Sequence, residues 1–134
     1  MKPFTLEPGM LTMGGVFYPT GHMFLMFPSG DEARRAAQKL MDDGFNAELI
    51  SLVTPQAIQE KIVRTVGHAD IPLPSVGTET DTVRKFAELA SQGHHALMIH
   101  APSGDETEQV MNTLKGTNIS YAQKYRHLVI EDLA

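Results

Sequence analysis

An internal repeat constrains the fold of this chain more than any other feature. The segment Pro28–Glu32 (PSGDE) recurs unchanged as Pro102–Glu106, and the offset from Pro28 to Pro102 is 74 residues. Apolar positions on both sides match at the same offset, as Leu25 does with Ile99. Each half therefore contains an apolar run, the shared turn, an amphipathic helix and a second apolar run. Two copies indicate a duplicated unit rather than a solenoid.

The shared turn has the pattern of a helix start. Ser29 and Ser103 are good N-cap residues, and Glu32 and Glu106 follow three positions later, which predicts a capping box in each half. The alternative is a phosphate cradle at the helix N-terminus. Acidic side chains in the first turn would repel a phosphate there, so we favour the structural interpretation.

The hydrophobic periodicity predicts four strands and four helices. The order is β-α-β, then two helices, then β-α-β. The expected strands are His22–Phe27, Ala47–Val53, His95–Ala101 and Ile119–Ile130, the last one bulged or bent. The expected helices are Gly30–Asp43, Pro55–Gly67, a segment from Thr78 that ends before Gly93, and Ser103–Lys115, with a loop over His68–Gly77.

Each half is a split βαβ unit, and two interleaved units form a ferredoxin-like α+β domain. The expected sheet is four-stranded and antiparallel, in the order 4-1-3-2. Two extra helices replace the usual link between its second and third strands. A chain of 134 residues has the length of one domain. We assign residues 1–20 to an N-terminal arm and residues 21–134 to this domain.

Side-chain alternation divides the two central strands into two faces. The face of Met23, Leu25 and Phe27 is purely apolar and is expected to carry the helices of the two halves. The other face mixes apolar side chains with two histidines. It is too apolar to lie bare in water, so inserted helices, a second subunit or a ligand must cover it. The candidate ligand-binding residues on it are Phe24, Met26 and Met98.

Antiparallel pairing of the first and third strands would make His22 and His100 cross-strand neighbours on this second face. Such a pair is a candidate for catalytic acid–base chemistry or for binding a metal. The simpler alternative is two polar caps on an apolar interface. The adjacent residues His94 and His95 point to opposite faces, so they cannot easily chelate one ion. The sequence specifies no metal site and no cofactor.

Composition excludes several classes of function. The chain has no cysteine, which rules out disulfides, thiolate metal sites and cysteine nucleophiles. Its formal net charge of −5 argues against nucleic acid and anionic membranes as partners. No signal peptide or membrane-spanning segment is expected. A small domain without disulfides fits a cytoplasmic location. Walker, Rossmann and nucleophile-elbow motifs are also missing.

The stretch from His22 to Gly116 resembles small bacterial domains of the general-stress or heat-induced stress protein type. The resemblance rests on "MFLMFPSGDEARRAAQKLMDDGFNAELISLV" and on "TVRKFAELASQGHHALMIHAPSGDETEQVMNTLKG". It is carried by apolar spacing and helix caps. That family implies no catalytic residues, so it contributes a fold and a stress-related setting only.

Three hypotheses on function follow. The first is a non-catalytic stress-related or small-ligand-sensing module that acts as a homo-oligomer, most simply a homodimer joined through the sheet face or the last strand. The second is a small enzyme with His22 and His100 as its acid–base pair. The third is a partner-binding protein that uses the arm around Val16–Tyr18.

Overall fold

The computed structural model describes residues 1–67, 77–127 and 129–133, which form a mixed α+β structure around one sheet. The strands are β1 (Lys2–Pro3), β2 (His22–Phe27), β3 (Ile50–Val53), β4 (His95–His100), β5 (Tyr121–Arg126) and β6 (Val129–Asp132). The helices are η1 (Pro8–Met10), α1 (Gly30–Asp42), η2 (Ala47–Leu49), α2 (Pro55–Ala57), η3 (Ile58–Ile62), α3 (Val63–Gly67), α4 (Gly77–Ser91) and α5 (Gly104–Thr113).

The sheet has six strands in the order β1-β3-β4-β2-β5-β6, so the expectation of four antiparallel strands is wrong. The four strands predicted from the repeat occupy its centre. The arm supplies β1, which pairs parallel to β3 and makes the sheet mixed. The predicted long strand Ile119–Ile130 is instead the antiparallel pair of β5 and β6, because the chain reverses between Arg126 and Val129.

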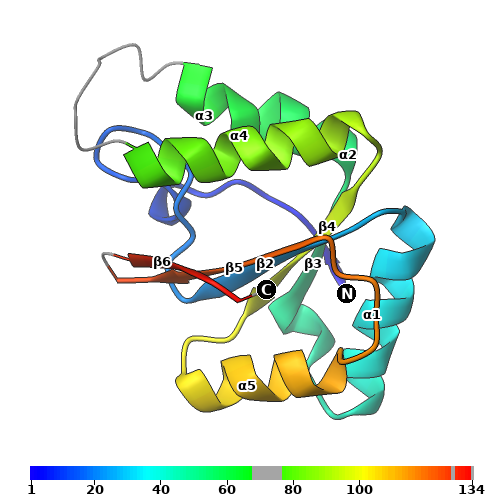
Figure 1. Ribbon diagram of the computed structural model, residues 1–134. Helices are drawn as coiled ribbons and strands as arrows, with labels where there is room; N and C mark the ends of the chain where they lie inside the picture. Colours follow the sequence, from blue (N-terminus) through cyan, green and yellow to red (C-terminus); the bar gives the residue numbers. More distant parts are fainter. Residues whose placement is uncertain (68–76, 128, 134) are drawn as a thin grey trace.

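Helices cover both faces of the sheet, which gives three layers (Figure 1). Helices α1 and α5 lie on one face, and the segment from α2 to α4 lies on the other. The predicted helix Pro55–Gly67 is continuous but contains the π-helical turn η3. Residues 68–76 of the expected loop His68–Gly77 lie outside the described residues, and its last residue begins α4.

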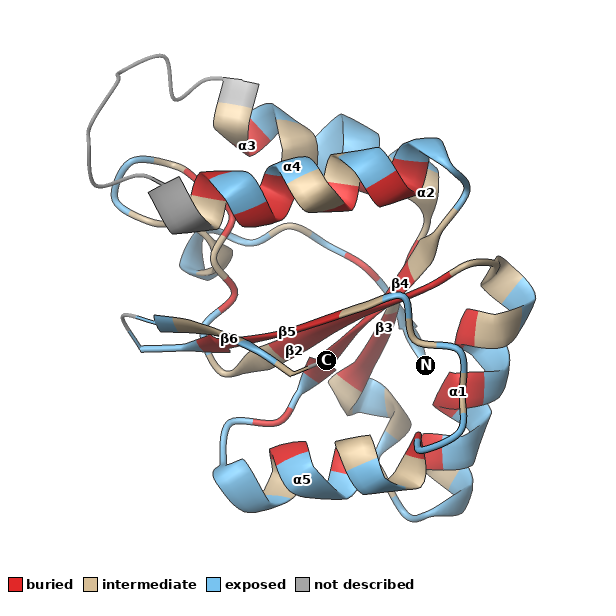
Figure 2. Ribbon diagram, viewed as in Figure 1, coloured by how far each residue is buried: buried red, intermediate tan, exposed pale blue. Residues whose placement is uncertain are grey.

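Two apolar cores fill the space between the layers, and each contains the apolar strand residues that side-chain alternation assigns to its face of the sheet. We call the core beneath α1 and α5 the lower core. It contains Met23, Leu25, Phe27, Ala36, Leu40, Leu97, Ile99 and Val110, all at most 1% exposed. The upper core, beneath α2–α4, contains Phe24, Met26, Val53, Ile58, Ile62, Val83, Phe86 and Met98, all at most 3% exposed. Figure 2 shows buried residues along the sheet and on the helix sides that face it.

The upper core shows what covers the second face of the sheet, which carries Phe24, Met26 and Met98. The inserted helices do so, through side chains such as Ile62 and Phe86. This covering accounts for the apolar character of that face without a second subunit. A dimer joined through this face is therefore not required by its hydrophobicity, while the outer edge of β6 remains open in the single chain.

Residues 1–20 belong to the packed domain rather than to a separable arm. Phe4, Val16 and Phe17 are all buried in the upper core. The backbone N–H of Phe17 also donates to Oγ1 of Thr65, at 3.0 Å, which ties the segment to α3. The boundary expected at residue 20 thus has no counterpart in the packing.

The two predicted capping boxes differ in detail. At α5, Ser103 accepts from the N–H of Glu106, and the Glu106 carboxylate accepts from the N–H of Ser103. At α1, Ser29 accepts from the N–H of Glu32, but the carboxylate accepts from the Ser29 hydroxyl and from Asn118 instead. Only the second copy of the turn therefore forms the full reciprocal box.

Candidate functional site

A cavity of about 230 Å³ lies where β2 and β3 begin and β4 ends. The arm closes one side of it and η2 another. Its lining mixes polar and apolar surface and comes from five parts of the chain. The lining residues are Lys2, Pro3, Thr5, Glu7, Met10, His22, Glu48, Leu49, Ser51, Met98 and His100.

The two histidines of this cavity are direct cross-strand partners. Antiparallel pairing of β2 with β4 sets His22 opposite His100, which confirms the register expected from the sequence. Their ring centroids lie 4.8 Å apart, with the ring planes tilted by 56°. His22 is half-buried and His100 is exposed. The pair therefore presents one sheltered and one accessible imidazole to the same cavity.

The surroundings of His22 favour its neutral form. Burial lowers the pKa of His22 from its ordinary value of 6.5, and the nearby His100 and Lys2 lower it further. The hydrogen bond to the Thr20 carbonyl acts in the opposite direction. That carbonyl lies 3.1 Å from Nδ1 and can only accept, so we assign the proton to Nδ1. Nε2 is then left as an acceptor or base.

This shift predicts a pH dependence of stability. Well above pH 6.5 His22 is neutral in both the folded and the unfolded chain, and it adds no dependence. Below that pH the unfolded chain takes up the proton first, so the free energy of unfolding falls until the folded ring also protonates. Urea unfolding between pH 5 and 7.5 should show a weaker fall in His22→Gln than in the native chain, with exposed His127→Gln as the control. An unchanged slope in His22→Gln would contradict the shift.

Gly21 positions the histidine pair. Its φ is +79°, in the left-handed region that favours glycine. Its N–H donates to the Tyr125 carbonyl at 2.8 Å, and its carbonyl accepts from the N–H of Ala101 at 3.0 Å. A Cβ at this position would lie 3.7 Å from Cε1 of His100, an ordinary contact. Substitution is therefore opposed by the backbone conformation and not by lack of space.

Gly21→Ala should lower the free energy of unfolding by about 1 to 2 kcal/mol, the cost of a side chain in the left-handed region. Chemical denaturation measures it. Gly9→Ala is the matched control, because Gly9 has no atom within 4 Å of its added Cβ and no positive φ. That control should be neutral or slightly stabilising. Equal effects of the two substitutions would remove the role assigned to Gly21.

The charged part of the lining could not be predicted from the sequence. Lys2, Glu7 and Glu48 come from the arm and from η2, and no pattern in the sequence connects them. Ser51 offered a signal, because it is a polar residue inside an apolar strand. It is 2% exposed, lies opposite Met98 on β4 and lines the cavity.

Of the other residues predicted to form a site, only some line the cavity. Met98 lines the cavity. Phe24 and Met26 are fully buried beneath the inserted helices, so they have no surface to offer a ligand. His94 bonds Ser120 through Nδ1 at 2.8 Å, away from the pair. In the described ranges, no three His, Cys, Asp or Glu side chains are grouped so that they could hold a metal ion.

Comparison with known proteins adds no further constraint on the site. No protein-family model, curated protein or solved structure matches this chain. Within the part that the structure describes, no helix is long and apolar enough to cross a membrane.

Proposed function

We propose that this domain binds a small zwitterionic molecule, bearing an amine and a carboxylate, in the cavity beside His22 and His100. The observation that carries the proposal is the pairing of two imidazoles at 4.8 Å on the wall of a cavity that charged residues of both signs also line. Binding sites of this kind combine a recess with a few convergent polar groups. The volume of about 230 Å³ suits a molecule smaller than a typical drug.

The charges on the lining support a zwitterion. Lys2 provides a cation for a carboxylate, and Glu7 and Glu48 provide anions for an amine. His22 in its neutral form adds a hydrogen-bond acceptor in the same cavity. A ligand with charges of both signs satisfies more of these groups than a simple anion or cation would.

Binding without turnover is the primary proposal, in keeping with a small-ligand-sensing module. Catalysis is the second candidate, and one observation favours it. A half-buried neutral imidazole next to an exposed one can accept a proton and pass it on. The two candidates differ in the fate of the bound molecule. It is released unchanged if the domain only binds it, and chemically altered if the domain is an enzyme.

Native mass spectrometry with a panel of amino acids at millimolar concentration tests the proposal. We expect one amino acid to bind per chain, and His22→Ala and His100→Ala to weaken its binding about tenfold or more, the loss of roughly 1.4 kcal/mol. His127→Ala, at an exposed position outside the cavity, should bind as the native chain does. Equal binding by all variants, or none by the native chain, would reject the proposal. Analysis of the released molecule separates sensing from catalysis.

Three broader proposals accompany it. The central strand order β3-β4-β2-β5 supports a ferredoxin-like core extended at both edges. The open edge of β6 supports a homodimer joined through the last strand. The resemblance to stress-protein domains supports a stress-related role in the cytoplasm. The subunit count from the same native spectra tests the dimer directly.

A further inference from the structure

A second cavity, of about 200 Å³, lies on the other face of the sheet, between α5 and the β5–β6 hairpin. Lys124 lines it from β5 and is only 4% exposed. Strand pairing sets Lys124 opposite Met23, so the side chain projects towards the lower core and α5. A lysine at such a position is unusual, because removing an ammonium group from water costs several kcal/mol unless it is paired.

The partners of Lys124 are neutral. Its Nζ donates to the Ala101 carbonyl and, at 2.8 Å, to Oγ1 of Thr107. Among the described residues, no carboxylate lies within the 4.0 Å of an ion pair with it. Two acceptors match the two N–H bonds of an uncharged amine and leave its lone pair free to react.

The charged groups around Lys124 are engaged with other partners or exposed. Arg126, two residues along the same strand, pairs with Glu131 on β6 at 3.2 Å. On α5, Glu106 accepts from Ser103 at 2.8 Å, and Glu108 is exposed at the cavity. Burial lowers the pKa of Lys124 and Arg126 lowers it further, while Glu106 and Glu131 raise it in part.

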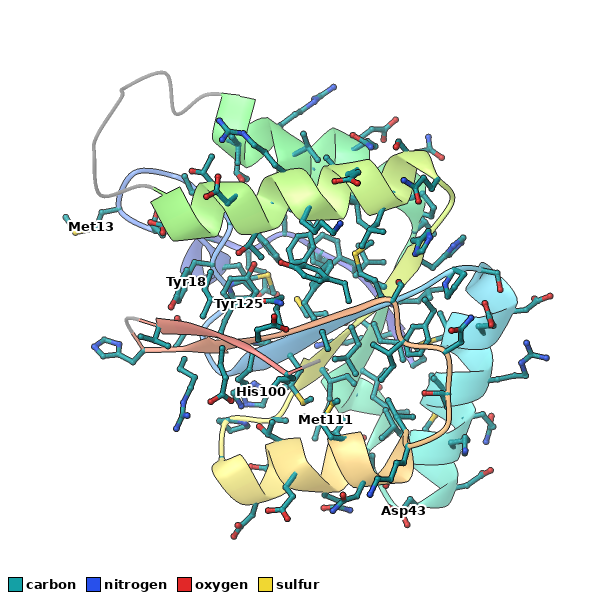
Figure 3. The ribbon with its side chains drawn as sticks, viewed as in Figure 1. Met13, Tyr18, Asp43, His100, Met111 and Tyr125 are labelled. Atoms are coloured by element: carbon teal, nitrogen blue, oxygen red, sulfur yellow. The ribbon has the colours of Figure 1, made fainter. Side chains whose placement is uncertain are left out.

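We propose that Lys124 is a nucleophilic amine that forms an imine with a small 2-oxo acid held in this cavity. Desolvation and a neighbouring cation are the two conditions that make a lysine amine nucleophilic. Arg126 keeps N–H donors beyond those facing Glu131, and these can bind the carboxylate of the acid. Met111, which projects from α5 towards the sheet (Figure 3), and Leu133 line the cavity with apolar surface for a short side chain.

The chemistry is a condensation without a redox step. The lone pair of Nζ attacks the keto carbon, and a proton moves from nitrogen to oxygen to give a carbinolamine. Loss of one water molecule then forms the C=N bond. Each imine formed consumes one amine and one carbonyl and releases one water, and hydrolysis reverses it.

Reductive trapping with pyruvate tests the inference. The native protein is incubated with pyruvate and sodium borohydride at pH 7, and peptide mapping locates the reduced adduct. The exposed lysines Lys39, Lys61 and Lys115 serve as internal controls within the same chain. We expect Lys124 to react at least about tenfold faster than these, because its burial and the neighbouring Arg126 favour the free amine. This selectivity should vanish in urea.

Two variants test the role of Arg126 and the location of the adduct. Arg126→Gln should reduce trapping of pyruvate at Lys124 more than trapping of acetaldehyde, because losing the nearby cation affects both carbonyls while losing the carboxylate partner affects pyruvate alone. Lys124→Met should lose the adduct at this position and retain the slow background at exposed lysines. If Lys124 in the folded native protein reacts no faster than the exposed lysines, it is a structural contact between β5 and α5 and the inference is wrong.

Discussion

Phe86→Ala should lower the free energy of unfolding by about 3 to 5 kcal/mol, the usual cost of removing a buried phenylalanine side chain. Phe86 lies on α4 with no exposed surface. Its ring stacks on that of Phe24 from β2, with centroids 4.2 Å apart and planes 29° from parallel. It also meets Tyr121 edge-on at 5.8 Å. This residue therefore joins the inserted helices to the centre of the sheet.

Urea denaturation at 25 °C measures the effect. Because a loss of this size is a large part of the stability of a typical domain, Phe86→Leu serves as a milder second variant that retains most of the contact. Val129→Ala is the control, since Val129 is 56% exposed and should change stability by no more than about 0.5 kcal/mol. A loss below about 1 kcal/mol in Phe86→Ala would mean that α4 does not cover this face.

Phe17→Ala should have an effect of similar size, about 3 to 5 kcal/mol, although Phe17 belongs to the segment expected to be a separate arm. Its ring is fully buried. It contacts Phe24 edge-on at 5.8 Å, Tyr125 at 5.9 Å and Phe4 at 6.4 Å. The segment is thus held by an aromatic cluster that reaches from β2 to β5.

Met13→Ala is the matched control for Phe17→Ala. Met13 lies four residues earlier in the same segment, is fully exposed and points away from the molecule (Figure 3). It should change the free energy of unfolding by no more than about 0.5 kcal/mol. Thermal and urea unfolding of both variants measure the difference. If both are neutral, residues 1–20 are a dispensable arm, and the partner-binding hypothesis for Val16–Tyr18 becomes the better account of them.

The sequence was most informative where side chains alternate along a buried strand and where the internal repeat applies. Alternation along His22–Phe27 assigned Met23 to the lower core and Phe24 to the upper core, because a strand buried on both faces still sends successive side chains in opposite directions. The repeat predicted the pairing of His22 with His100, since equivalent strands of the two halves lie antiparallel at the centre of the sheet.

The sequence was least informative where contacts are long-range and unpatterned. The two residues of β1 pair with Ser51 and Leu52, some 50 positions away. A strand of two residues is too short to show the alternation from which strands are predicted. The reversal between Arg126 and Val129 contains neither Gly nor Pro, the residues that usually mark a turn. The sequence therefore predicts one long strand in place of β5 and β6. Lys2, Glu7 and Glu48 line one cavity, but no sequence pattern connects them. Only the folded structure shows that they lie together.

We propose that His22 and His100 titrate as one coupled pair on the wall of the cavity. Side-chain NMR of ¹³C,¹⁵N-labelled histidine, followed from pH 4.5 to 8, tests it most directly. We predict that His22 titrates below its ordinary value of 6.5, with Nδ1 protonated in the neutral ring, and that His100→Gln raises its midpoint by removing a nearby positive charge. Titration of His22 at 6.5, unchanged in His100→Gln, would contradict the claim.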